Sequence, residues 1–207
     1  MSDPRPLSTE ELVAWRDALL MQIAAAFDGI ELGDGTTIGE AYAIDDSKSP
    51  EVRAAQRAKD TYRQWQDIDV ASDGGGSAMT FMNARGWAFH APAYAAFFLR
   101  HDTRLPGGIE RDDWVSDRLD VEAVFLLSQG ELDRIDALSP AQRAVIVDLI
   151  MLDWEIAHAY AEASPDAGDA GYGSHLGALG VRWMRHASPE RREAFLERWP
   201  AAYPEPV

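Results

Sequence analysis

Apolar residues recur along most of the chain at the three- and four-residue spacing of an amphipathic helix. In the first such segment one face carries Leu12, Leu19, Ile23 and Phe27. Ser8 and Glu11 precede this face as a capping box, in which each side chain accepts from the other residue's backbone N–H. Gly29 supplies a stop signal. The pattern therefore predicts a helix from Ser8 to just before Gly29.

Caps and prolines mark the starts of the other expected helices. Ser, Thr or Pro at these starts, followed by periodic apolar residues, predicts helices over 37–45, 51–65, 92–100, 139–162 and 189–199. Apolar periodicity predicts two more over 112–127 and 175–186. Residues 78–84 form a short apolar element, and residues 86–89 suit an extended chain.

The helical pattern predicts the fold class and its division. We expect an all-α protein, a single helical domain of about seven to nine helices. The domain is expected over residues 1–163, and a small-residue linker after them leads to a C-terminal helical extension, 164–207, packed on the same domain. No segment demands a long strand.

Charge and composition exclude several functional classes. Asp and Glu number 35 against 19 Lys and Arg, for a net charge of −16, which repels the phosphate backbone of nucleic acid. The absence of cysteine excludes disulfides, thiol nucleophiles and cysteine-ligated zinc. The longest apolar run, 91–99, is too short to span a membrane, and residues 1–10 lack the apolar segment of a secretory signal. We expect a cytoplasmic protein.

Known catalytic and cofactor motifs are absent or incomplete. The glycine-rich stretch at 171–177 lacks the preceding buried strand of a dinucleotide site, and the glycines at 74–76 lack the Lys-Ser/Thr of a phosphate loop. No Gly-x-Ser-x-Gly nucleophile elbow occurs. These absences predict no cofactor and favour a non-enzymatic role.

The long helix expected over 139–162 carries a stripe of carboxylates. Asp148, Glu155 and Glu162 lie opposite its apolar face, which favours a solvent-exposed polar surface. Glu155 and His158 have the Glu-x-x-His spacing of di-iron bundles, but such bundles need a second copy and further carboxylates. We therefore predict no metal site.

Two charged residues fall on faces that should be buried. Asp153 lies between Leu149 and Ile146 on the helical wheel, and Arg16 lies beside Ile23 on the first helix. A buried charge needs a partner, so a structural ion pair is one interpretation. A carboxylate with a shifted pKa in a cleft is the other. Whether Arg16 pairs with Asp153 is left open.

A central part of the chain resembles a bacterial family of unknown function. The similarity covers residues 19–155 and rests on the order of several motifs, which are residues 26–35, Ile38, 40–41, 44–46, Trp65, 79–94 and 138–143. The chain departs from the family pattern at His90-Ala91, where Tyr-Leu is expected, and in the segment after Ser164. The resemblance implies a helical domain and no particular activity.

The matched positions supply a candidate binding site. Most are glycines, aromatic residues and caps, and the candidate cleft consists of Glu40, Asp45, Asp46, Trp65, Arg85, Trp87, His90 and Tyr94. An ordinary core with capped helix ends explains the same residues equally simply. A structure in which they line one cavity would favour a binding site.

Three functions follow from these observations. A strongly acidic helical domain suits a protein-binding module, such as an inhibitor or immunity-type protein for a basic partner. Acidity that only maintains solubility is the simpler alternative. A small-molecule binder or hydrolase-like enzyme with a Glu/Asp/Arg/His cleft is the second candidate, and a homodimer formed through exposed members of the seven tryptophans is the third.

Overall fold

The regular elements of the protein are helical in every part of the chain that the structure describes. The computed structural model describes residues 5–73, 77–108, 125, 132–163 and 183–199. The helices are α1 (Thr9–Ala26), α2 (Ile38–Asp45), α3 (Pro50–Arg57), α4 (Ala84–His101), α7 (Leu132–Asp136), α8 (Pro140–Ala163) and α10 (Pro189–Arg198). Three short 3₁₀ helices are η1 (Trp65–Asp67), η2 (Val70–Asp73) and η3 (Ser77–Phe81). The all-α prediction is confirmed.

Two parts of the predicted layout fall outside the described residues. These are the helix expected over 112–127 and most of the helix expected over 175–186. The division of the chain into residues 1–163 and an extension stays a prediction.

The helix starts follow the predicted caps. At α1, Ser8 N–H donates to Glu11 Oε2 (2.7 Å) while Glu11 N–H donates to Ser8 Oγ (3.3 Å). Thr37 caps α2 by accepting from Glu40 N–H (3.2 Å). Ser188 caps α10 through the N–H of Arg191. Local side-chain chemistry therefore decides where these helices begin.

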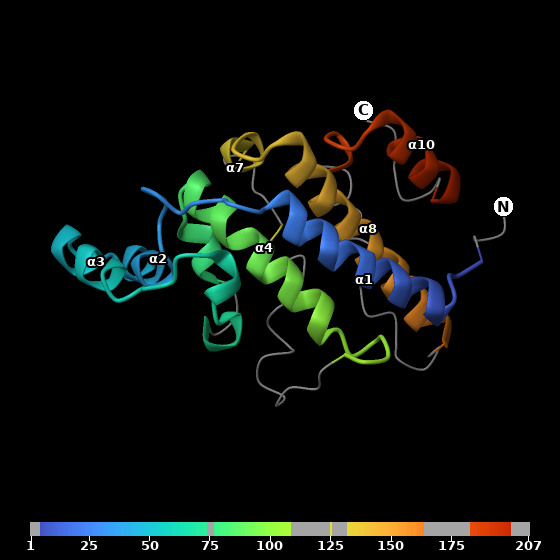
Figure 1. Cartoon of the computed structure of the whole chain (residues 1–207), viewed down its shortest axis with the longest axis horizontal. Coiled ribbons are helices and arrows are strands. Elements are labelled where there is room, and N and C mark those ends of the chain that lie inside the picture. Colours follow the sequence, from blue (N-terminus) through green and yellow to red (C-terminus); the bar gives the residue numbers. More distant parts are fainter. Residues whose placement is uncertain (1–4, 74–76, 109–124, 126–131, 164–182, 200–207) are drawn as a thin grey trace.

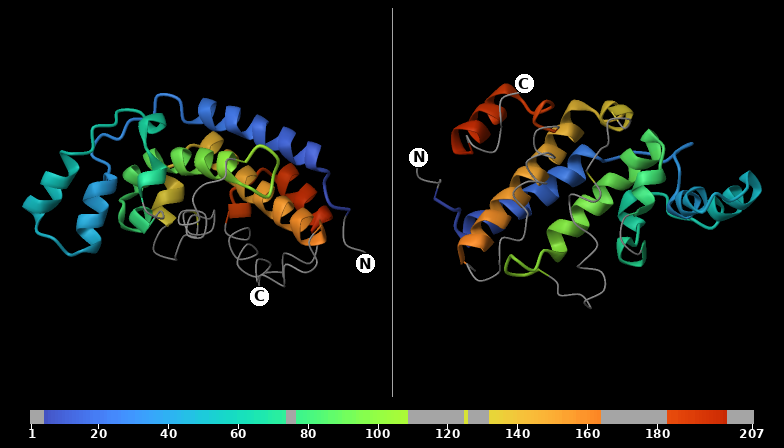
Figure 2. Two further views of the ribbon diagram at one scale, coloured as in Figure 1. Left: turned by 90° about the horizontal axis from the view of Figure 1, so that it is seen from below. Right: turned by 180° about the vertical axis from the view of Figure 1, so that it is seen from behind.

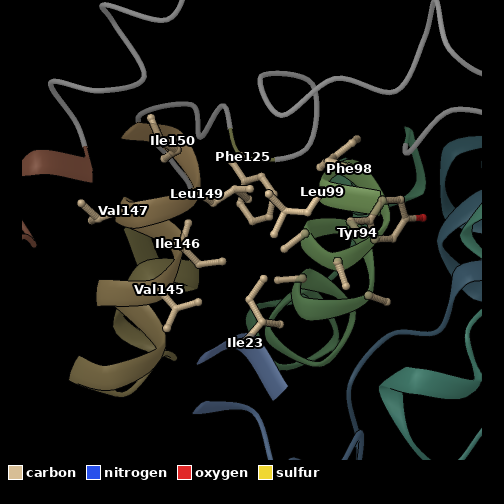
Figure 3. Close-up of a cluster of buried hydrophobic side chains, with 14 of the residues drawn as sticks. Ile23, Tyr94, Phe98, Leu99, Phe125, Val145, Ile146, Val147, Leu149 and Ile150 are labelled. Atoms are coloured by element: carbon tan, nitrogen blue, oxygen red, sulfur yellow. The ribbon is translucent and has the colours of Figure 1, made fainter. Parts of the chain in front are cut away.

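Three long helices, α1, α4 and α8, enclose the hydrophobic core (Figure 1). Helix α1 packs against both α8 and α4. Figure 3 shows Phe125 reaching between Leu149 of α8 and Leu99 of α4, with Ile23 of α1 nearby. Each of these four side chains is at most 3% exposed. Burial of such side chains supplies most of the stabilisation.

Helices α2 and α3 form an arm at one end of the molecule (Figures 1 and 2). Helix α2 packs against α3 and η3, and it buries Ala41 and Ala43. Helix α3 buries no side chain completely. Apolar contacts to the core therefore come from α2, through Ala41, Ile38 and Tyr42, and α3 adds no buried side chain.

Helix α3 is shorter than predicted and ends at Arg57 instead of near Trp65. The residues that follow leave the helix to cap α2. Asp60 Oδ2 accepts from Gly39 N–H (2.8 Å), and the Tyr62 hydroxyl accepts from Ile38 N–H (3.0 Å). These tertiary bonds outweigh the helical propensity of the local sequence.

Helix α4 begins at Ala84, so the prediction of a start at Pro92 and an extended segment at 86–89 is wrong. Asn83 supplies the cap by accepting from Gly86 N–H (2.8 Å). Pro92 lies inside the helix, although an interior proline costs about 3 kcal/mol. The helix tolerates Pro92 because large side chains on both sides, including Trp87 and Phe98, are buried.

Helix α10 lies beside α8 (Figures 1 and 2) and contacts it through aromatic and charged side chains. Phe195 and Trp199 meet Trp154 of α8 edge to face, at ring-centroid distances of 6.2 and 5.7 Å. In the part of the chain that the structure describes, no helix combines the length and apolar character needed to cross a membrane.

Candidate functional site

Glu40 takes part in a bonded network at a glycine turn. Arg57 Nη1 donates to Glu40 Oε2 (2.8 Å) and to the carbonyl of Gly35 (2.5 Å). Its Nη2 donates to the carbonyl of Gly33 (2.8 Å). One guanidinium thus connects α3 to α2 and to the turn before it. The Glu40 carboxylate is engaged in this connection.

Arg85 lies on another side of the same turn. Its guanidinium occupies the space that a Cβ at Gly33 would need, and its Nη1 lies 3.3 Å from Asp34 Oδ1. The next residue, Gly86, packs directly on the backbone of Thr36, where a Cβ would come within 2.6 Å of the Thr36 nitrogen. The turn and the first residues of α4 are therefore in close backbone contact.

His90 is fully buried in α4 and bonded at both ring nitrogens. Its Nδ1 lies 2.6 Å from the carbonyl oxygen of Gly86, and its Nε2 lies 2.8 Å from the Tyr62 hydroxyl. A carbonyl only accepts, so Nδ1 carries the hydrogen and Nε2 accepts from Tyr62. The Tyr62 oxygen in turn accepts from Ile38 N–H at the start of α2. The histidine connects α4 to the arm.

Burial decides the protonation state of His90. Removal from water lowers its pKa to about 4, against the opposing effects of the Gly86 carbonyl and the Asp60 carboxylate. Burial therefore keeps the imidazole neutral at pH 7, and its two hydrogen bonds are compatible with that form.

Asp45 and Asp46 lie apart from these residues. Both are exposed at the C-terminal end of α2, and Asp46 lies 3.6 Å from the Lys48 amine. Glu40, Arg85 and His90, by contrast, all surround the N-terminal end of α2. An eight-residue helix is about 12 Å long, so the two carboxylates do not meet the other three side chains.

The aromatic members of the predicted cleft belong to the core. Trp65 donates its indole N–H to the carbonyl of Phe27 (3.3 Å), and Tyr94 is fully buried. Trp87 stacks against Trp183 at a centroid distance of 6.3 Å. The Trp87 indole nitrogen is buried with no hydrogen-bond partner among the described residues. None of the described tryptophans is exposed, so an aromatic dimer patch finds no support among them.

The structure therefore brings Glu40, Arg85 and His90 to one end of α2 and places the other predicted residues elsewhere. A small cavity of about 10 Å³ lies elsewhere, between α8, Phe195 of α10 and Trp183. A binding role for the predicted set stays a prediction.

Arg16 and Asp153 are largely buried, as their positions on the helical wheels predict. Their side chains are 12% and 13% exposed. Arg16 donates to the carbonyl of Pro106 (3.0 Å) and to Asp17 (3.0 Å). Asp153 forms an ion pair with Arg104, which also binds Asp102. Both charges connect helices to the loop after α4.

Asp148 and Glu155 contradict the prediction of a solvent-exposed stripe on α8. They are 5% and 3% exposed, because α10 covers them. Arg191 forms an ion pair with Asp148, and Arg198 forms one with Glu155. Burial raises the pKa of Asp148, and the hydrogen bond and charge of Arg191 offset only part of this rise.

Glu155 also accepts from the Trp199 indole N–H (2.8 Å), so its oxygens are occupied by donors. His158 stands edge-on to Trp199, and its Nε2 is buried without a hydrogen-bond partner among the described residues. Those residues contain no group of three or more side chains able to hold a metal ion. The Glu155–His158 pair thus forms part of the contact between α8 and α10.

With this geometry in place, comparison with known proteins identifies the family. The profile of the Family of unknown function (DUF6714) matches residues 15–160. The chain belongs to this family. No curated protein matches it, and no solved structure does either. The DUF6714 segment runs from within α1 to within α8 and includes the glycine turn, His90 and both buried carboxylates of α8, whereas α10 follows it.

Most of the described arginines of this DUF6714 protein are at least partly buried. Every described arginine that is not exposed donates to a backbone carbonyl or to a carboxylate, and these are Arg16, Arg53, Arg57, Arg104, Arg134, Arg143, Arg191, Arg192 and Arg198. Arg134, for example, is 8% exposed and donates to the carbonyls of Thr80 and Met82 at the end of η3.

Carboxylates dominate the exposed surface instead. The exposed acidic residues in the described segments are Glu10, Glu11, Asp17, Asp28, Glu31, Asp34, Asp45, Asp46, Glu51, Asp67, Asp69, Asp133, Asp136, Glu162, Glu190, Glu193 and Glu197. The exposed basic residues in the same segments are Arg5, Lys48, Lys59, Arg63, Arg85, Arg100 and Arg185. Sequence reasoning found the net charge, but the inward direction of the arginines needs the structure.

Proposed function

We propose that this protein is a non-enzymatic binding module that engages a basic protein partner, in the manner of an inhibitor or immunity-type protein. The observation that carries the proposal is the separation of charge between interior and surface. Arginines bind backbone carbonyls and buried carboxylates, while carboxylates populate the exposed positions. Among the described residues, exposed acidic side chains therefore clearly outnumber exposed basic ones.

A field of one sign favours a partner of the opposite sign. Carboxylates on a low-dielectric surface attract a cationic protein at long range and repel acidic competitors, which gives fast and selective association. The places of Glu40 and His90 support this role over catalysis, because both are bonded to structural partners at the base of the arm. We also propose that the protein is located in a bacterial cytoplasm. A chain without cysteine forms no disulfides, so it has no need of an oxidising compartment.

The experiment is affinity capture from extract of the native host, with the full chain as bait. We expect a basic protein to be retained at low salt and released at high salt. The comparison bait carries Glu10→Gln, Asp28→Asn, Glu31→Gln and Asp45→Asn, which remove four exposed charges without removing a side-chain bond seen in the structure. This bait should retain much less of the partner.

A control bait makes the surface charge more negative instead of less negative. Arg63→Gln with Arg100→Gln removes two exposed positive charges and should retain the partner at least as well as the unmodified chain. Capture that is equal for all three baits, or that selects acidic or neutral proteins, would contradict the proposed function.

A further inference from the structure

Helices α8 and α10 are joined by two ion pairs in matching register. Asp148 and Glu155 are seven residues apart on α8, as Arg191 and Arg198 are on α10. Seven residues are two turns, about 10.5 Å, so each arginine meets its carboxylate along the same pair of helix faces. Two cations seven residues apart on a helix therefore fit this acidic face of α8.

The face beneath α10 is apolar between the two carboxylates. Met151 and Trp154 of α8 lie there with Val147, and Phe195 of α10 packs over them. A small cavity of about 10 Å³ remains between these side chains and Trp183. An apolar surface with carboxylates at each end suits an amphipathic helix that carries cations at the same spacing.

Helix α10 is held to this face by few buried side chains. In the described part of α10 and its C-cap, Phe195 and Trp199 are buried, at 6% and 9% exposure. Two such side chains contribute only about 3 to 6 kcal/mol. Buried ion pairs add little net stability when the alternative is solvent, because both charges regain water on opening. Helix α10 is therefore suited to open locally while the core stays folded.

The extent of the family match also distinguishes α10 from the face that it covers. The DUF6714 segment, residues 15–160, contains Asp148, Glu155 and the apolar residues between them. Helix α10 (Pro189–Arg198) follows that segment. The acidic face therefore lies within the segment that the family profile matches, and its occupant lies outside that segment.

We propose that this face of α8 is the docking surface for a cationic amphipathic helix of the partner, and that α10 occupies it in the free protein and is displaced on binding. The inference rests on the proposed function and names the surface and regulation of that binding. The partner helix is expected to present two arginines or lysines seven residues apart, with aromatic side chains between or beside them, as α10 does.

The test uses a fluorescent synthetic peptide with the sequence of residues 188–199 as the probe. It is titrated into the full chain and into the full-chain variant Arg191→Ala/Arg198→Ala, whose own α10 has lost both ion pairs. Because the apparent affinity rises with the fraction of open sites, we expect binding to the variant to be at least roughly tenfold tighter. A peptide that carries Arg191→Ala and Arg198→Ala but keeps Arg192 should bind at least roughly tenfold more weakly.

Arg192→Ala is the matched control. Arg192 lies on the same helix but donates to the carbonyls of Met184 and Arg185 instead of an α8 carboxylate. This variant should bind the peptide as the unmodified chain does. Equal peptide binding to all three proteins, or equal binding of the unmodified peptide and the Arg191→Ala/Arg198→Ala peptide, would overturn the proposal.

Hydrogen exchange on the unmodified protein tests the same proposal without a variant. The amides of α10 should exchange at least roughly tenfold faster than those of α1, α4 and α8. Protection of α10 equal to that of α8 would overturn displacement. If the peptide test fails while salt-sensitive capture of a basic partner succeeds, this inference falls and the proposed function stands. If the peptide test succeeds while capture fails, the proposed function falls and the partner helix falls with it, and only the displacement of α10 from α8 stands.

Discussion

At the scale of single residues, His90 shows how a polar group is used inside this fold. Its imidazole is fully buried and bonded to the Gly86 carbonyl at Nδ1 and to the Tyr62 hydroxyl at Nε2, and burial favours the neutral ring. Protonation would place a charge in the core and turn an acceptor into a donor facing Tyr62. The residue therefore links the stability of the protein to pH.

We predict that His90 makes the protein less stable as the pH falls. The folded pKa of about 4 lies below the ordinary value of 6.5, so the unfolded state binds the extra proton between these values. The stabilisation is present above pH 6.5 and is lost as the pH falls towards 4. Between about pH 7 and about pH 5, the free energy of unfolding should fall by about 2 kcal/mol through this group.

Urea denaturation of the unmodified protein and of His90→Asn measures this contribution. The difference between the two pH dependences isolates His90 from the many carboxylates that titrate in both proteins. The same fall in unfolding free energy in both proteins would show that His90 is not the group responsible.

The burial of a charged side chain could be predicted only where residues of its own helix surround it. Arg16 and Asp153 stand among apolar residues on their helical wheels, so their burial was predictable. Asp148 and Glu155 stand on the polar side of α8, and the sequence of α8 contains no sign that α10 covers that side. Their arginine partners lie more than 40 residues away in the chain.

At the scale of elements, the first turn of α4 connects the core to the arm. Asn83 Oδ1 accepts from Gly86 N–H (2.8 Å) and from Thr36 N–H (3.0 Å), and Asn83 N–H donates to Thr36 Oγ1 (3.1 Å). One side chain thus caps a helix and binds the glycine turn that leads into α2. The position of the arm depends on this junction.

Asn83→Ala should lower the free energy of unfolding by about 2 kcal/mol, about 1 for the helix cap and about 1 for the bond to Thr36. Thermal or urea denaturation measures the loss. Ser8→Ala is the matched control, because Ser8 caps α1 without a bond to another element and should cost only about 1 kcal/mol. Equal losses would contradict a role for Asn83 beyond capping.

Helix starts were more predictable than helix ends. Ser8, Thr37 and Ser188 act through neighbouring residues, so local sequence contains the whole signal. The end of α3 depends on Asp60 and Tyr62 reaching the start of α2, which is a tertiary contact. The start of α4 was missed because Pro92 is a strong start signal, and only burial on nearly all sides of α4 allows it inside the helix.

At the scale of the whole molecule, the separation of charge has a consequence for stability. Exposed carboxylates repel one another, whereas the inward arginines are shielded from salt by burial. The candidate site was less predictable than the fold for the same reason. Of the polar residues that match the family pattern, Glu40, Arg85 and His90 lie around the N-terminal end of α2, but the direction in which each arginine points depends on long-range contacts.

Added salt should therefore stabilise the protein. Raising NaCl from about 0.1 M to about 1 M shortens the screening length from about 10 Å to about 3 Å. We expect the free energy of unfolding to rise by on the order of 1 kcal/mol. The variant with Glu10→Gln, Asp28→Asn, Glu31→Gln and Asp45→Asn should gain clearly less. A loss of stability with salt would show that surface attraction, not repulsion, dominates.

The most direct test of the binding function is the salt dependence of affinity for the captured partner. Calorimetric titrations of the purified pair across about 0.05 to 0.5 M NaCl should show the affinity falling by at least roughly tenfold. The variant with four neutralised carboxylates should bind more weakly at low salt and approach the unmodified protein at high salt. An affinity that does not change with salt, or that is the same for both proteins, would contradict an acidic surface as the basis of recognition.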